Sequence, residues 1–189
     1  MSSSMSSAPK CASSTSWRRC GCPRSRQPHR PDMRLHIRAV GRVPGRAPER
    51  ALIDDYRSRA AQTGRALGWA DVSETEVDER KANGMAAEAA ALQKALPDAA
   101  VLVCLDERGA LLSSPEFATR LQGWAEQGRR DIVFMIGGAD GLDPALRARA
   151  DLVLSFGQMV WPHKLARVML AEQIYRAATI LAGGPYHRV

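Results

Sequence analysis

The chain has 189 residues, of which 45% are hydrophobic, 25% charged and 5% aromatic, a composition typical of one soluble globular domain. Its longest apolar runs, residues 99–105 and 132–136, are too short to cross a bilayer, and four cysteines are too few for a disulfide scaffold. Most of the formal net charge of +7 lies in residues 1–32, which carry six Lys and Arg against one Asp. The overall charge therefore does not identify the remaining chain as a nucleic-acid binder.

The first 32 residues differ in composition from everything that follows. They contain nine Ser and four Pro but no Ile, Leu, Val or Phe, so a fold there would bury too little apolar surface to offset its ordering entropy. Cys11, Cys20, Cys22 and His29 match no spacing of zinc ligands, and we predict no metal site. We expect a disordered leader over 1–32, Met33 as the natural start, and the folded domain over 33–189.

From Met33 onward, strand and helix patterns alternate along the chain. Residues 34–40 alternate apolar and polar side chains, which predicts a strand. Residues 48–64 then predict a helix with Pro near its start and Gly at its end. Residues 69–77 form a second, weaker strand pattern.

The middle of the chain continues this alternation. Residues 84–96 are Ala-rich and predict a helix that ends before a proline. Residues 99–105 form a near-continuous apolar run, typical of a central parallel strand covered on both faces. Ser114 and Pro115 predict the N-cap and first residue of a helix that extends to Gln127.

The last third predicts two strands and two helices. Residues 132–136 form another buried strand, and Asp143 caps a short helix that reaches Ala150. A short strand over 152–155 precedes a long amphipathic helix over 162–181. Because strands and helices alternate throughout, we predict an α/β domain built on a three-layer, mostly parallel sheet.

A glycine-rich turn, Ile136-Gly-Gly-Ala-Asp-Gly141, directly follows a predicted buried strand. Glycines there let the backbone approach a ligand closely, and open α/β sheets bind ligands at the carboxyl ends of their strands. The turn lacks the GxGxxG pattern of a Rossmann fold and the Gly-Lys-Ser/Thr of a P-loop. A ligand-binding loop and an ordinary tight turn both fit this motif by itself.

Two features follow the turn. The loop at 154–163 is unusually apolar, so it either packs in the core or wraps a ligand. The next helix interrupts an apolar run with four charged or titratable residues: His163, Arg167, Glu172 and Arg176. These residues either pair internally, as the i, i+4 spacing of Glu172 and Arg176 allows, or face a site or a subunit interface.

The C-terminal residues also carry unusual chemistry. A terminus of this length is unstructured by default. Here, however, Tyr186, His187 and Arg188 combine an aromatic ring, a titratable donor and a guanidinium. These groups are suited to stacking on a base and to holding a phosphate.

The order and spacing of these motifs resemble the SPOUT class of S-adenosylmethionine-dependent methyltransferases, and more narrowly the RlmH family. The matching segments are residues 33–41, 103–106, 136–142, 154–163, Arg167, 172–176 and 186–188. RlmH proteins methylate N3 of a pseudouridine in helix 69 of large-subunit ribosomal RNA. The resemblance therefore implies an rRNA methyltransferase that acts on the assembled ribosome in the cytoplasm. Cys104 lies within a predicted apolar strand, and the buried, reduced thiol expected there suits a cytosolic protein.

The resemblance further implies a C-terminal trefoil knot that holds S-adenosylmethionine. Carried over residue by residue, the cofactor contacts are Leu105, Gly137, Phe156, Gly157, Gln158, Met159, Val160 and Trp161. Gly137 would leave room for the adenosine, and Leu105 and Trp161 would form apolar walls. Trp161 is bulkier than the family pattern, which puts side-chain roles in this loop in doubt more than backbone roles.

A homodimer is implied as well, with the last helix in the interface and the partner's C-terminal residues completing each site. The helix over 162–181 agrees, since it carries apolar side chains around more of its circumference than one sheet face can cover. Within the implied site, N3 must lose its imide proton before it attacks. His163, Glu172 and His187 are the titratable candidates, and the sequence does not choose among them.

The remaining implied site residues would hold the RNA. Arg176 and Arg188 suit a phosphate or the negative charge on the deprotonated base, and Tyr186 suits stacking on a flipped nucleotide. The near balance of charge after residue 32, 21 basic against 19 acidic side chains, favours a substrate presented by the ribosome over free RNA.

Two other functions fit parts of the sequence. A non-catalytic ribosome-binding protein would keep this fold without the cofactor, but the intact glycine turn and C-terminal motif argue against it. An unrelated nucleotide-dependent reductase or hydrolase would use the glycine turn as a phosphate site, but the chain has neither a GxSxG elbow nor a clear catalytic triad. We therefore expect a methyltransferase.

Overall fold

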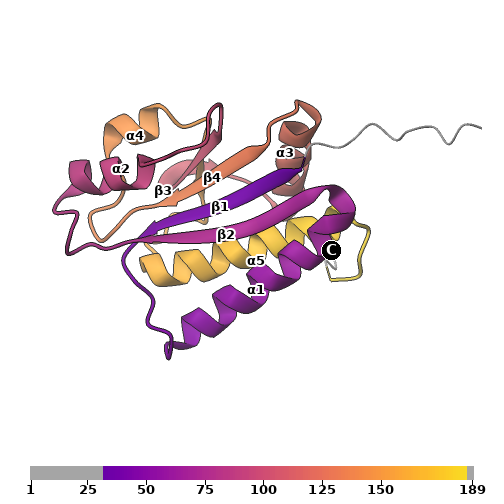
Figure 1. The fold of residues 1–189 in the computed structure, drawn as a ribbon, viewed down its shortest axis with the longest axis horizontal. Coiled ribbons are helices and arrows are strands. Elements are labelled where there is room, and N and C mark those ends of the chain that lie inside the picture. The colour runs from indigo at the N-terminus through magenta and orange to yellow at the C-terminus, as the bar shows by residue number, and fades with distance from the viewer. Residues whose placement is uncertain (1–31, 187–189) are drawn as a thin grey trace, which may run out of the picture.

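A computed structural model describes residues 32–186 (Figure 1). The strands are β1 (Met33–Val40), β2 (Trp69–Val77), β3 (Val101–Leu111), β4 (Asp131–Ile136) and β5 (Leu152–Ser155). The helices are α1 (Pro48–Gly64), a 3-10 turn at Arg65–Leu67, α2 (Met85–Gln93), α3 (Ser114–Glu126), α4 (Pro144–Ala148) and α5 (His163–Leu181). Within this range, no helix is long and apolar enough to span a membrane. Of the expected leader over 1–32, residues 1–31 lie outside the described residues, as do His187 and Arg188.

The strands form one parallel sheet in the order β2-β1-β4-β3-β5. β4 lies at its centre, and all six of its residues are buried, as the run of apolar residues predicts for a strand covered on both faces. Because all the strands are parallel, their carboxyl ends meet at one edge of the sheet, where the glycine turn after β4 also lies.

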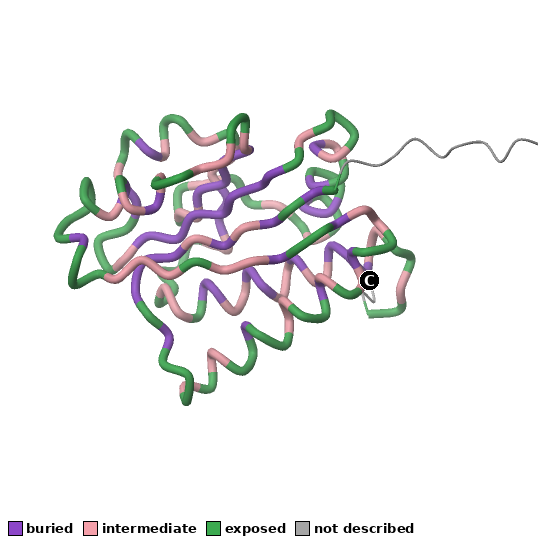
Figure 2. Tube along the Cα trace, viewed as in Figure 1, coloured by how far each residue is buried: buried purple, intermediate pink, exposed green. Residues whose placement is uncertain are grey.

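Helices cover both faces of the sheet, so the predicted three-layer α/β architecture is confirmed. Figure 1 shows α1 and α5 on one face and α2 and α4 on the other. The larger core packs α1, α3 and α5 against the first face, and a smaller core packs α2 and α4 against the second. The buried residues accordingly follow the strands and the inner sides of these helices (Figure 2). The trefoil knot stays a prediction of the resemblance.

The long helix α5 is covered only in part by its own chain. It contacts α1 and α3 as well as the sheet, and its buried residues include Leu170, Ile174 and Ala178. Leu165 is still 43% exposed and Val168 and Met169 are only half-buried, so the expectation that a second subunit covers the rest of the helix stays a prediction.

Strand β3 extends to Leu111, beyond the predicted end at residue 105, and its last two residues pair with Leu154 and Ser155 of β5. Two helix boundaries also differ from the prediction. The N-cap of α3 is Ser113 and not Ser114, because Ser113 and Glu116 form a capping box in which the Glu116 carboxylate accepts from the Ser113 N–H at 2.7 Å. Helix α2 ends at Gln93, before Pro97, because Arg38 of β1 caps it. The Arg38 guanidinium donates to the carbonyl oxygens of Leu92, Lys94 and Ala95.

Candidate functional site

A cavity of about 790 Å³ opens at the carboxyl edge of the sheet. Three segments form its walls: residues 105–108 after the buried part of β3, the glycine turn at 136–142, and the loop at 156–163. Single residues of other elements complete it: Met85, Pro144, Arg147, Leu154 and Ala166. Segments far apart in the sequence meet here because parallel strands end at the same edge, the usual ligand position in open α/β sheets.

The glycine turn is too tight to accept a side chain at Gly137. A Cβ atom there would overlap the Gly141 carbonyl oxygen and lie 2.9 Å from the Leu142 nitrogen. Gly141 itself has a φ of +81°, which favours glycine. The turn therefore needs Gly137 for its own closure. This differs from the expected reason, which was space for the adenosine.

The glycine turn rests on α2. A Cβ at Gly138 would lie 3.0 Å from the Glu88 carboxylate, so helix and turn are in close contact. Burial raises the pKa of Glu88, and a hydrogen bond from the Gly138 backbone partly opposes that shift. Contact with Glu88 of α2 therefore helps to hold the glycine turn in place beside the cavity.

The loop between β5 and α5 is exposed, so the alternative that it packs in the core was wrong. Ser155 fixes its start, because the hydroxyl accepts from the Gly157 N–H at 3.1 Å. Beyond that point, Met159 is 70%, Val160 79% and Trp161 40% exposed. These apolar side chains border the cavity and also face outward.

The structure places all the predicted cofactor contacts except Gln158 around this cavity: Leu105, Gly137, Phe156, Gly157, Met159, Val160 and Trp161. Gln158 is exposed and is not part of the wall.

His163, the first residue of α5, also lines the cavity. Its Nε2 atom lies close to Gly41, where an added Cβ would be only 3.0 Å away. Burial, together with the positive charge of Arg167, lowers the pKa of His163. The ring is therefore neutral at neutral pH and has a nitrogen lone pair free to accept a proton.

Arg147 and Asp106 form an ion pair in the cavity wall that the sequence did not predict. The Arg147 Nη1 donates to the Asp106 Oδ2 at 2.8 Å. The Asp106 Oδ1 accepts from the backbone N–H of Arg108 at 3.0 Å, so both carboxylate oxygens are engaged. The position of Asp106 directly after a predicted buried strand pointed to the carboxyl edge of the sheet. Nothing in the sequence linked it to Arg147, which lies 41 residues further along the chain.

Arg167 is fully buried and joins three elements. Its Nη1 donates to Glu74 at 3.1 Å and to Glu76 at 2.8 Å, both on β2. Its Nη2 donates to the carbonyl oxygens of Val40 and Gly41 at the end of β1. This pairing inside the chain is one of the two alternatives that the sequence left open.

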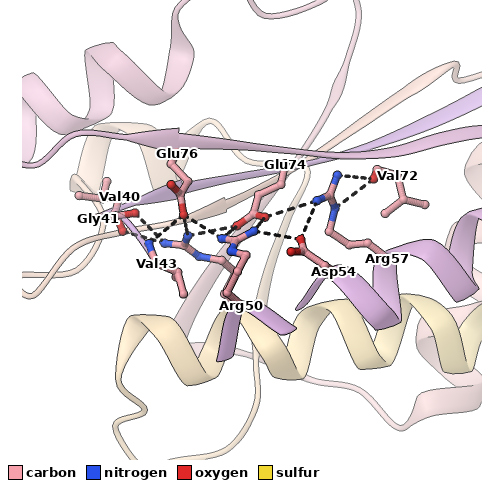
Figure 3. Close-up of polar contacts among 10 residues, drawn as sticks. Val40, Gly41, Val43, Arg50, Asp54, Arg57, Val72, Glu74 and Glu76 are labelled. Carbon is pink, nitrogen blue, oxygen red and sulfur yellow. Dashed lines mark hydrogen bonds and ion pairs between the residues drawn. The ribbon is translucent and has the colours of Figure 1, made fainter. Parts of the chain in front are cut away.

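Arg50 of α1 binds the same two carboxylates (Figure 3), at 2.6 Å from Glu74 and 2.9 Å from Glu76. Burial alone would raise the pKa of Glu74, but the hydrogen bonds and charges of Arg50 and Arg167 outweigh it and hold that pKa below its usual value. The i, i+2 spacing of Glu74 and Glu76 places both on one face of β2, a signal that the sequence analysis did not use.

Glu172, Arg176 and Tyr186 form a separate cluster further along α5. Arg176 donates to Glu172 from Nε at 2.9 Å and from Nη2 at 2.6 Å, so the predicted i, i+4 pair is present. The Tyr186 hydroxyl donates to the same carboxylate oxygen at 3.2 Å, and the guanidinium lies 4.9 Å from the centre of the Tyr186 ring. Burial and the negative charge of Glu172 raise the pKa of Tyr186 to about 12, so its phenol stays protonated at neutral pH.

This cluster does not reach the cavity within one chain. Glu172 lines a neighbouring cavity of about 530 Å³ that shares Leu154 and Phe156 with the first, but Arg176 and Tyr186 line neither. Arg176 lies ten residues beyond Ala166, about 15 Å along the helix axis. His187 and Arg188 lie outside the described residues, so their roles stay predictions.

The sequence was compared with known proteins. The family model described as "Predicted SPOUT methyltransferase" matches residues 33–187. The chain belongs to the SPOUT methyltransferase family. A Ribosomal RNA large subunit methyltransferase H from Ruegeria pomeroyi is 62% identical over 157 residues, which are 83% of this chain and 100% of that protein. The protein of the same name from Roseobacter denitrificans is 61% identical over 82% of this chain and 99% of its own length.

The resemblance to SPOUT proteins of the RlmH type is thus confirmed. Among solved structures, the SpoU methyltransferase AviRb from Streptomyces viridochromogenes, crystallised with AdoMet, has a TM-score of 0.39 and 16% identity, covering 82% of this chain and 60% of its own. A likeness that distant carries no argument about the site. The SPOUT family match, in contrast, spans every segment that lines the cavity.

Proposed function

We propose that this protein transfers a methyl group from S-adenosylmethionine to N3 of a pseudouridine in helix 69 of large-subunit ribosomal RNA. It would act in the cytoplasm on the assembled ribosome. The observation that carries the proposal is the cavity at the carboxyl edge of the sheet, built from segments that the SPOUT methyltransferase family model covers. The names of the relatives at about 60% identity support ribosomal RNA as the substrate.

The cavity fits a molecule of the size and chemistry of S-adenosylmethionine. Its volume of about 790 Å³ lies within the range of small-molecule sites, roughly 300–1,000 Å³. Leu105, Ile136, Leu154 and Phe156 supply apolar walls, and the glycine turn supplies backbone groups that a ligand can approach closely. Asp106, Arg147 and His163 are convergent polar groups, as a bound amino-acid and nucleoside ligand requires.

The bound cofactor supplies an activated methyl group, and this chain's residues orient the reactants and manage the proton of N3. Of the described candidates for the general base, His163 lines the cavity and holds a neutral ring. Glu172 is hydrogen-bonded to Gln173, Arg176 and Tyr186, which leaves it less available as a base. The described geometry favours His163 and leaves His187 to be tested.

We also propose a homodimer in which each cavity receives the C-terminal residues of the partner. Arg176 lies about 15 Å from the cavity along α5 and Tyr186 packs beside its guanidinium, so one chain does not assemble all the predicted site residues. The exposed apolar side chains beside the cavity, Met159, Val160 and Trp161, give a second copy a surface to cover. The apolar residues of α5 that its own chain leaves partly exposed, Leu165, Val168 and Met169, support a dimer as well.

Mass spectrometry of helix 69 nucleotides from cells that lack this gene tests the proposal. The N3-methylated pseudouridine should be missing and should return when the gene is restored. Purified protein with methyl-labelled S-adenosylmethionine should label intact ribosomes and not free rRNA. A non-catalytic ribosome-binding protein would instead bind ribosomes, fail to bind the cofactor, and leave the nucleotide pattern unchanged.

A further inference from the structure

Arg147 has unused hydrogen-bonding capacity inside the cavity. Its side chain is only 19% exposed, yet within residues 32–186 only Nη1 has an acceptor, which is Asp106. Its Nε atom is buried and without an acceptor among the same residues. Within the described part of the chain, the Nε atoms of Arg38 and Arg167 are unpaired in the same way, but of these three arginines only Arg147 lines the cavity, where a ligand can supply an acceptor.

The pairing with Asp106 leaves one particular edge of the guanidinium free. Nη1 is directed at the carboxylate, while Nε and Nη2 form the side-on edge, which can hold a carboxylate through two parallel hydrogen bonds. Asp106 cannot turn to a ligand, because its other oxygen accepts from the Arg108 N–H. Asp106 therefore acts as an orienting residue that fixes the plane of the Arg147 guanidinium.

The other cationic groups around the cavity are less suited to bind an anion. The Arg108 side chain is 71% exposed and has the Glu107 carboxylate 3.7 Å away, and water screens such a group. His163 has a lowered pKa and is neutral at neutral pH. Arg147 is thus the cation that is permanently charged, shielded from solvent and held in place.

We propose that the free edge of Arg147 binds the carboxylate of the amino-acid part of the cofactor, which rests on the proposed function. The cofactor's carboxylate is its one anionic group. The apolar residues Leu105, Leu154 and Phe156 would take its other parts, and Arg147 stands at the polar side of the same cavity. Replacing Arg147 should then weaken the binding of ligands that have the carboxylate and leave the binding of ligands that lack it unchanged.

Calorimetric titration with two nucleosides tests this assignment. S-adenosylhomocysteine carries the amino-acid part, and 5′-methylthioadenosine lacks it. Arg147→Met should lower the affinity for S-adenosylhomocysteine by about ten- to hundredfold, as expected for a hydrogen-bonded charge pair. It should change the affinity for 5′-methylthioadenosine by less than about twofold. Arg149→Met is the matched control: Arg149 directly follows the same helix, is exposed, donates to Gln93 and does not line the cavity. It should change neither affinity.

The outcomes separate the two proposals. If the unaltered protein binds both ligands but Arg147→Met weakens them equally or not at all, the carboxylate assignment is overturned and the cofactor site stands. A preference for adenosine monophosphate over 5′-methylthioadenosine that Arg147→Met abolishes would overturn it in favour of a phosphate site. If the unaltered protein binds neither S-adenosylhomocysteine nor 5′-methylthioadenosine, the proposed function fails, and the inference fails with it. Circular dichroism confirms that each variant is folded.

Discussion

The Arg167 guanidinium donates to the carbonyl oxygen of Gly41 at 3.0 Å, which fastens the second turn of α5 to the residue after β1. Gly41 also lies against the His163 ring at the start of the same helix. The buried ion cluster of Figure 3 therefore does more than hold α1, α5 and β2 together. It sets the position of His163 relative to the cavity.

Replacing Arg167 should be among the most destabilising changes in this domain. Arg167→Met leaves Glu74 buried with one partner fewer, and breaking a buried pair in this way costs about 3–5 kcal/mol. Denaturant unfolding followed by circular dichroism measures the loss. Arg59→Met, which removes an exposed pair with Asp55, should cost less than about 1 kcal/mol. Equal losses for the two variants would show that the buried cluster adds no net stability.

The same cluster should make the folded state sensitive to acid. The pKa of Glu74 is held below its usual value in the folded protein, so the unfolded state binds the proton more readily. The stability that this difference contributes is present above the unfolded pKa, about 4.3, and is lost as the pH falls through the lower folded pKa.

Glu74→Gln should therefore lower stability at pH 7 and flatten its decline below about pH 4.3. Unfolding free energies measured from pH 7 to pH 3 give both quantities. Glu126→Gln, at an exposed position of α3, serves as the control and should follow the unaltered protein. An unchanged acid slope in Glu74→Gln would contradict the linkage.

The glycine turn gives a third prediction. Gly137→Ala should weaken S-adenosylhomocysteine binding by at least about tenfold, because a Cβ overlaps the Gly141 carbonyl and the turn must open. Gly123→Ala lies within α3, where an added Cβ meets nothing within 4 Å, and should gain about 0.5–1 kcal/mol of stability without affecting binding. Calorimetric titration of both variants makes the comparison. Full affinity in a folded Gly137→Ala protein would exclude the turn from the ligand site.

Local sequence signals predicted most of the fold, and contacts between distant residues account for what they missed. The bounds of α1, β2 and β5 agree with the prediction because prolines, glycines and apolar periodicity act within a few residues. The end of α2 depended on Arg38, more than fifty residues earlier in the chain. Likewise, the charges of Arg147 and Arg167 were visible in the sequence, but their partners on β3 and β2 were not, because only the folded sheet brings them together.

A fourth prediction concerns the start of the folded domain. A protein that begins at Met33 should have the melting temperature of the full chain, because residues 1–32 contain no Ile, Leu, Val or Phe to pack on the domain. Met33 itself is the first residue of β1 and is completely buried. A protein that begins at Leu35 should melt at a lower temperature, because it loses the Met33 side chain and the ion pair from Arg34 to Asp131. Differential scanning calorimetry compares the three proteins. A lower melting temperature for the Met33 form would show that residues 1–32 contribute to the fold.

The last prediction tests whether two copies share each site. Gly137→Val should lose cofactor binding, because a branched side chain cannot fit against the Gly141 carbonyl, but it keeps its C-terminal residues. Arg188→Ala should bind the cofactor but present a faulty C-terminus. In a heterodimer of these two inactive proteins, one of the two sites combines an intact cavity with an intact C-terminus from the other subunit.

Methylation should then return to as much as half of the unaltered level per heterodimer, provided that the sites act independently. Native mass spectrometry verifies that heterodimers have formed, and transfer of labelled methyl groups to ribosomes measures their activity. The two variants assayed separately give the background, which should be near zero. Because Arg176 stands about 15 Å along α5 from the cavity of its own chain, complementation is the result that this separation predicts. Confirmed heterodimers without recovered activity would show that each cavity uses the C-terminus of its own subunit.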